Sequence, residues 1–271
     1  QEGMGNMYDK SLRLVNIVDI INTELNLSIA EGALERTAYL SKADLVTGMV
    51  TEFTELQGVM GKEYALLDGE KPEVAQGIEE QYMPRFAGDV LPQSPIGSIL
   101  SIADKMDNIV ATFGRGLAPT GSQDPFALRR QALGFINIVI ENKYHLSSTK
   151  VLAGICALLK IDENRISELL TQIMDFIKLR FKNMLLDQGV RYDIIDSVLQ
   201  NTDVSDDLFD LYLKIMAMKN FVTKAEAADL IQASVRVNNL CSKLENENII
   251  SERLLQAPAE QELYKQVILV D

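Results

Sequence analysis

Three acidic residues in the first part of the chain have the chemistry of a metal site. Asp44, Glu80 and Asp104 lie in or beside segments with helical spacing, and carboxylate oxygens are the ligands that Mg²⁺ prefers. A zinc site is not expected, because two separated cysteines and one histidine cannot supply its usual ligand set. The interpretation that we favour is structural: Asp104 pairs with Lys105 or a neighbouring arginine, and no metal is bound. A metal site formed by these three acidic residues is the less favoured alternative.

Residues for nucleophilic and acid–base catalysis do not form a recognisable motif. His145 is the only histidine and lies in a polar break after a long apolar segment, which favours a surface role. The sequence holds no GxSxG segment and no Cys–His pairing of the hydrolase types. Gly114, Gly116 and Gly121 fit neither the Walker nor the Rossmann pattern of a phosphate-binding loop. We expect this chain to hold no catalytic residue and no cofactor.

Basic side chains are the other group with usable chemistry, because they bind phosphate. Lys178 and Lys182 are four residues apart and share one face of a helix, whereas Arg180 points elsewhere. A solvated helix face is the ordinary explanation of such residues. The alternative is contact with RNA, since arginine can grip phosphate or stack on a base. The candidate RNA-binding residues are Arg115, Arg129, Arg130, Lys178, Lys182, Arg236 and Lys243.

The last two candidates form a polar stripe. Arg236 and Lys243 are seven residues apart on one side of the expected helix Ala225–Lys243, with Asn239 between them. Asparagine can read base edges, so the stripe is compatible with an RNA-facing surface.

Composition limits the classes of function. The chain has 271 residues, 47% of them hydrophobic and 24% charged, which is typical of a globular protein. Its formal net charge of −13 argues against a general nucleic-acid or membrane coat, but leaves room for a local basic face. Cys156 and Cys241 lie in apolar segments, where we expect buried thiols and a reducing cytoplasm. No apolar run is long enough to span a bilayer, so no membrane partner is expected.

Apolar residues recur every three or four positions and strand signals are nearly absent, which predicts an all-α fold. The stretch Ala103–Arg130 contains the end of a central helix, a Gly/Pro loop and a helix start, in which Asp124 caps and Pro125 is the first helical residue. The chain begins at Gln1 and stops within an apolar run, which we take as a sign of a fragment. The expected helices are Tyr8–Leu25, Ala30–Val50, Phe53–Leu66, Pro72–Tyr82, Ile96–Phe113, Pro125–Asn142, Lys150–Leu159, Glu163–Leu186, Tyr192–Leu199, Asp206–Ala217, Ala225–Lys243 and Pro258–Asp271.

The first five helices resemble the HD superfamily of phosphohydrolases. The segments LSKAD, EQY and ADKMD have the order and rough spacing of that arrangement, with Asp44 and Asp104 at aspartate positions. The histidine positions of the family hold other residues here. An HD-like scaffold without hydrolytic chemistry is therefore the favoured interpretation, and an HD-type metal phosphohydrolase is kept as an alternative.

Longer runs carry a second and more specific resemblance. The runs ADKMDNIVATFGRG and PTGSQDPFALRRQALGFINIVIE are similar to the β subunit of bacterial-type heterotetrameric glycyl-tRNA synthetases, as are AYLSKADLVTGMVTEFTELQGVMGKEYA and EEQYMPRFAGDVLP. SVRVNNLCSK resembles the entry to that subunit's anticodon-binding domain. The resemblance implies an HD-like helical domain (1–118), a helical body or linker (119–215), and the first part of an arginyl-tRNA-synthetase-like anticodon-binding helical domain (216–271).

The same resemblance implies a function. Such a subunit would recognise tRNA(Gly) within an α2β2 glycine–tRNA ligase of the cytoplasm, while the α subunit uses ATP and Mg²⁺ in the chemistry of glycylation. This chain alone would not catalyse the reaction. A purely structural helical scaffold that packs on the α subunit is the remaining alternative.

Overall fold

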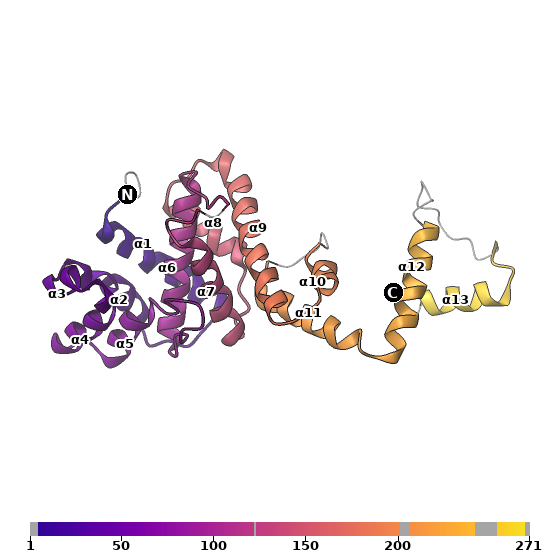
Figure 1. Ribbon diagram of the computed structural model, residues 1–271, viewed down its shortest axis with the longest axis horizontal. Coiled ribbons are helices and arrows are strands. Elements are labelled where there is room, and N and C mark those ends of the chain that lie inside the picture. The colour runs from indigo at the N-terminus through magenta and orange to yellow at the C-terminus, as the bar shows by residue number, and fades with distance from the viewer. Residues whose placement is uncertain (1–4, 122, 201–205, 242–253, 269–271) are drawn as a thin grey trace. The chain divides into compact units, whose positions relative to one another are not determined.

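The computed structural model describes residues 5–121, 123–200, 206–241 and 254–268, and within them it contains helices and no strands (Figure 1). The predicted all-α fold is confirmed. Two compact units are formed by Gln1–Lys219 and Asn220–Asp271. The first half of the chain contains α1 (Met7–Leu25), α2 (Ala33–Leu40), the 3₁₀ helix η1 (Ala43–Val46), α3 (Gly48–Glu52), η2 (Thr54–Leu56), α4 (Val59–Leu67), α5 (Pro72–Glu80) and α6 (Pro95–Gly114). The remaining helices are α7 (Leu128–Glu141), α8 (Ser148–Leu158), α9 (Glu163–Asp187), α10 (Tyr192–Leu199), α11 (Leu208–Phe221), α12 (Ala225–Cys241) and α13 (Pro258–Ile268).

Helix α6 is the centre of the first unit, as its nearly continuous apolar sequence predicts. Ser94 caps its first turn by accepting a hydrogen bond from the backbone N–H of Gly97, and Pro95 occupies the first turn. The helix packs against α1, α2, α5, α7, α8 and α9. Ile99, Leu100 and Ile102 are fully buried in this packing, and each contributes roughly 1.5–3 kcal/mol through removal of its surface from water.

The prediction of one helix from Ala30 to Val50 is wrong. The α-helix ends at Leu40, and the 3₁₀ helix that follows ends at Val46. The chain forms α2, then η1, then α3, and Thr47 caps α3 by accepting a hydrogen bond from the N–H of Val50. The predicted helix Phe53–Leu66 also begins too early. Gly58 has a φ of 82°, and its N–H donates to the Asp44 carboxylate at 2.7 Å, so α4 starts one residue later.

The start of α7 combines a confirmed and a wrong prediction. Asp124 caps the helix, since its carboxylate accepts hydrogen bonds from the backbone N–H groups of Leu128 at 2.8 Å and Arg129 at 2.9 Å. Pro125 is not the first helical residue. The chain makes one more turn through Ala127, whose φ of 52° is left-handed, and α7 begins at Leu128.

The last helices of the first unit follow α7. Cys156 of α8 is a buried free thiol, as expected, and burial raises its pKa to about 11. The side chain of Cys241 lies outside the described residues.

In the second unit, α12 buries Ala227 but exposes Leu230, Ile231 and Val235. None of the described helices is long and apolar enough to cross a membrane.

Candidate nucleic-acid interface

Three arginines line a groove of about 650 Å³ in the first unit. Arg129 and Arg130 come from the first turn of α7, and Arg180 comes from α9. Asn137 and Asn183 add amide groups to the same lining, which also includes Asp187. We refer to this feature as the arginine groove.

Backbone contacts orient the two arginines of α7. The Arg129 guanidinium donates to the carbonyl of Gly121, and the Arg130 guanidinium donates to the carbonyl of Arg85 at 3.1 Å. Asp124, which is close to both in sequence, uses its carboxylate oxygens on the helix N-terminus instead. Asp124 therefore forms no ion pair with either arginine.

Arg180 is held by an aromatic ring. Its guanidinium carbon lies 4.4 Å from the centroid of the Phe176 ring, one turn earlier on α9. Partial burial lowers the pKa of Arg180, and the positive charge of Arg129 lowers it further, while the negative charge of Asp124 opposes both. The two arginines therefore repel each other, and an anion between them would relieve the repulsion.

The three arginines differ in their partners from three other surface cations of the first unit. Arg36, Lys182 and Arg191 each form an ion pair with a carboxylate, from Glu70, Asp196 and Asp193 respectively. Within the part of the chain that the structure describes, none of the arginines of the groove does so. A phosphate backbone needs unpaired cationic side chains of this kind.

The other candidate RNA-binding residues are not among those that line this groove, or fall outside the described residues. Lys182 is engaged with Asp196, and Lys178 lies one turn before it on α9. Arg115 follows α6 and lines a smaller cavity of about 300 Å³. Arg236 is exposed on α12 in the second unit. The prediction for Lys243 falls outside the described residues.

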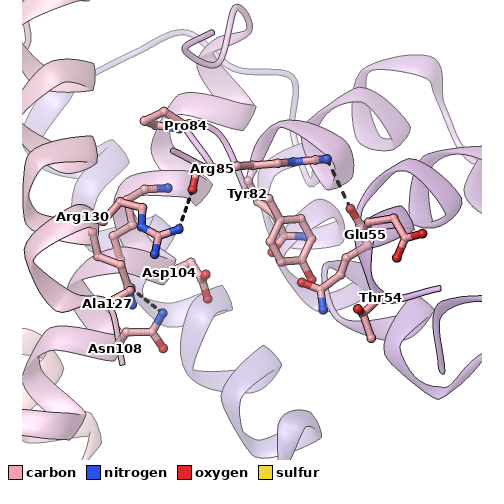
Figure 2. Close-up of a pocket in the computed structure, with 13 residues that line it drawn as sticks. Thr54, Glu55, Tyr82, Pro84, Arg85, Asp104, Asn108, Ala127 and Arg130 are labelled. Atoms are coloured by element: carbon pink, nitrogen blue, oxygen red, sulfur yellow. Dashed lines mark hydrogen bonds between the residues drawn. The ribbon is translucent and has the colours of Figure 1, made fainter. Parts of the chain in front are cut away.

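A second hollow of about 450 Å³ adjoins the groove, because Arg130 lines both. We call it the polar cavity. In Figure 2, Thr54 and Glu55 stand on one side and Arg130 and Asn108 on the other. Arg85 crosses the mouth and donates to the backbone carbonyl of Gln57 at 3.3 Å, as the dashed line in Figure 2 shows.

Buried charges form part of the wall of the polar cavity, which Asp104 lines. Asp104 of α6 forms ion pairs with Lys10 of α1 at 3.0 Å and with Lys42 at 3.1 Å, and Lys10 also pairs with Asp107 at 2.8 Å. Burial would raise the pKa of Asp104, but the two ammonium groups outweigh it and hold that pKa well below its usual range. The expected partner Lys105 is not the one observed.

Lys105 has a different environment. Its ammonium group donates to the carbonyl of Met83 at 2.8 Å and to the hydroxyl of Ser101 at 2.6 Å. Burial lowers the pKa of Lys105 to about 8, despite the nearby negative charge of Asp104. Lys105 is therefore a buried hydrogen-bond donor in the wall of the polar cavity, next to Asp104.

The proposed metal ligands do not converge. Asp44 accepts from Gly58, Glu80 accepts from the backbone N–H groups of Gln93 at 3.2 Å and Ser94 at 3.1 Å, and Asp104 holds two lysines. Among the described residues, no group of three or more His, Cys, Asp or Glu side chains is arranged to hold a metal. This donor set does not fit the divalent metal centre of an HD phosphohydrolase.

His145 has a structural contact. Its Nδ1 lies 2.7 Å from a carboxylate oxygen of Asp207, and its ring packs edge-on against Phe209. Both partners lie at the start of α11, so the histidine ties the loop before α8 to that helix.

Arg180 is the residue of the groove that sequence reasoning set aside. It was separated from Lys178 and Lys182 because it lies on another face of α9, and that geometry is confirmed. The face it occupies also carries Asn183, Met184 and Asp187, at spacings of three, four and seven residues. That spacing was a usable signal for a shared polar surface.

Comparison with known proteins gives one consistent result. Residues 1–200 match the model of the family described as "Glycyl-tRNA synthetase beta subunit". The chain is 44% identical over 268 residues to the "Glycine--tRNA ligase beta subunit" of Clostridioides difficile (strain 630), covering 98% of this chain and 38% of that protein. A protein of the same name from Mannheimia succiniciproducens is 40% identical over 270 residues, which is 99% of this chain and 38% of the relative. The chain thus spans under two fifths of the length of these relatives.

Proposed function

Since the chain belongs to the glycyl-tRNA synthetase beta subunit family, we propose that it forms a tRNA-recognition part of a glycine–tRNA ligase. Its substrate would be tRNA(Gly), and its partner would be the α subunit of an α2β2 enzyme in the cytoplasm. ATP and Mg²⁺ would be used on the α subunit, where glycine is activated.

The arginine groove is the observation that carries this proposal. The chain has a formal net charge of −13, so RNA must be met on a limited surface. Arg129, Arg130 and Arg180 provide such a surface, since they share one groove without carboxylate partners among the described residues. Arginine suits the task because its planar guanidinium binds phosphate with paired hydrogen bonds.

Charge reversal tests the proposal directly. Arg130→Glu and Arg180→Glu are expected to weaken binding of tRNA(Gly) by about tenfold or more each, because an attractive phosphate contact becomes repulsive. Fluorescence anisotropy with labelled tRNA(Gly) measures the affinity, and circular dichroism checks that the helices remain.

Arg191→Glu is the matched control. It makes the same change of charge at an exposed arginine that pairs with Asp193 and lies outside the groove. Its affinity for tRNA(Gly) should stay within about twofold of the original chain. Equal losses in all three variants would point to net charge alone and contradict a role of the groove.

A further inference from the structure

The polar cavity and the arginine groove share one lining residue, Arg130. Its guanidinium is fixed by the backbone carbonyl of Arg85 at the cavity mouth. A phosphate bound at Arg130 would therefore lie at the entrance of the cavity. The group attached to that phosphate would be directed either along the groove or into the cavity.

The cavity has two chemically different sides. Lys105 and Arg130 place positive charge on one side, which also includes the Asp104 carboxylate paired with Lys10 and Lys42. Arg85 crosses from this side to the backbone carbonyl of Gln57. None of Lys105, Arg85 and Arg130 forms an ion pair with a carboxylate in the described part of the chain. The opposite side comes from η2 and its flank, with the hydroxyl of Thr54 and the carboxylate of Glu55 (Figure 2). A fitting ligand carries negative charge at one end and hydrogen-bond donors at the other.

Unsatisfied polar atoms lie in the same wall. Gln81 Oε1 and the Tyr82 hydroxyl are buried, and within the described residues they have no hydrogen-bond partner. Both residues line the cavity. Such atoms are costly in a folded protein, so a polar occupant that supplied donors would stabilise the site.

We propose that the polar cavity receives one unpaired nucleotide of the RNA whose backbone lies in the arginine groove. The inference rests on the proposed function. The phosphate of the nucleotide lies at Arg130, and its base enters the cavity below the Arg85 side chain, which spans the mouth to the carbonyl of Gln57. The guanidinium plane of Arg85 can stack on the base, while Glu55 can accept a hydrogen bond from an exocyclic amino group. A cavity of about 450 Å³ suits one nucleotide, not a duplex.

Two RNA hairpins with the same stem test this inference, one blunt and one with four unpaired nucleotides at its 3′ end. The original chain should bind the second hairpin roughly five- to a hundredfold more tightly, since one held base contributes about 1–3 kcal/mol. Thr54→Trp should fill the cavity and reduce the affinity for the unpaired RNA to that for the blunt one. Thr54 is exposed at the cavity edge, so this change should leave the core intact.

Two variants separate the possible failures. Glu52→Trp introduces the same large ring at an exposed position outside the cavity lining and should keep the preference for unpaired RNA. Arg180→Glu should weaken binding of both hairpins by a similar factor. If neither hairpin binds the original chain, the proposed function fails and this inference fails with it. If both bind equally, or if Thr54→Trp keeps the preference, the inference alone is overturned.

Crosslinking gives an independent readout of the position. A 4-thiouridine placed among the unpaired nucleotides should crosslink to peptides that contain residues 54–57 or 81–85. Crosslinks confined to other segments would contradict the proposal. Binding of free cytidine or guanosine monophosphate without any preference between the hairpins would assign the cavity to a small nucleotide and also overturn it.

Discussion

The ammonium group of Lys10 lies 3.0 Å from the carboxylate of Asp104, and both side chains are buried. This contact joins α1 to α6 at the wall of the polar cavity. Lys42 approaches the same carboxylate oxygen at 3.1 Å and also lies over the Tyr82 ring at 4.5 Å. Asp104 therefore neutralises two buried cations contributed by two other segments.

Removal of this carboxylate should be strongly destabilising. Asp104→Ala leaves Lys10 and Lys42 buried with less compensation, so we expect a loss of about 3–5 kcal/mol in the free energy of unfolding. Urea denaturation followed by circular dichroism measures it. Asp196→Ala, which removes a partly exposed partner of Lys182, should cost under about 1 kcal/mol. A small effect of Asp104→Ala, similar to that of the control, would show that the ion pairs contribute little.

This network also shows what the sequence could and could not predict. The central position of α6 follows from its apolar residues alone, and Asp104 stands out as a charge within them. The ion-pair partners of Asp104 cannot be predicted from the sequence, because Lys10 and Lys42 come from distant segments. The neighbouring Lys105 instead donates hydrogen bonds to Met83 and Ser101. Helical periodicity defines the face of a residue, whereas ion pairs depend on how the helices pack.

Lys105 should make the stability of the chain rise with pH in the alkaline range. Its pKa is about 8 in the folded chain, chiefly because of burial, against an ordinary value of 10.5. Between these values the unfolded chain binds the proton that the folded chain has released, so the free energy of unfolding increases with pH. The gain should be on the order of 2–3 kcal/mol across the window.

Lys105→Met isolates this contribution, since other groups also titrate in that range. The difference in unfolding free energy between the original chain and Lys105→Met, measured from pH 7.5 to 10.5, should change in favour of the original chain as pH rises. A difference that does not depend on pH would contradict the lowered pKa.

The close approach of Gly97 and Glu80 predicts a sensitive glycine. A Cβ atom at residue 97 would lie 2.1 Å from a carboxylate oxygen of Glu80, which accepts hydrogen bonds from the backbone just before α6. Gly97→Ala should therefore displace Glu80 and cost about 1–3 kcal/mol in unfolding free energy. Gly48→Ala is the control, because a Cβ there meets nothing within 4 Å. A thermal melt of each variant decides the matter, and equal melting temperatures would refute the predicted clash.

Asp124→Ala should affect both stability and the arginine groove. The change removes two hydrogen bonds to the first turn of α7 and should cost about 1–2 kcal/mol in unfolding free energy. Because Arg129 and Arg130 follow that turn, the affinity for tRNA(Gly) should fall as well. Asp124→Asn retains an acceptor and should recover most of the stability. If affinity is lost equally in both variants, the negative charge of Asp124, and not its capping, matters to the groove.

The candidate site shows a similar limit of sequence reasoning. The cap at Asp124 and the basic pair after it were predictable, because they depend on neighbouring residues. The left-handed Ala127 was not, and it sets α7 three residues later than Pro125. The meeting of Arg180 with Arg129 is also a tertiary feature, since α9 lies about fifty residues farther along the chain.

The salt dependence of binding should distinguish the charge of Arg180 from its shape. Arg180→Gln removes one phosphate contact, so the slope of log affinity against log salt concentration should become shallower by about 0.7–0.9. Arg180→Lys keeps the charge and should keep the slope, yet it should bind more weakly at every salt concentration, because an ammonium group cannot reproduce the planar guanidinium over Phe176. Anisotropy titrations with tRNA(Gly) between 50 and 300 mM KCl, about the range in which counterion release is resolved, measure both quantities. An unchanged slope in Arg180→Gln would mean that this arginine contacts no phosphate. Phosphate contacts of the groove would then be left to Arg129 and Arg130.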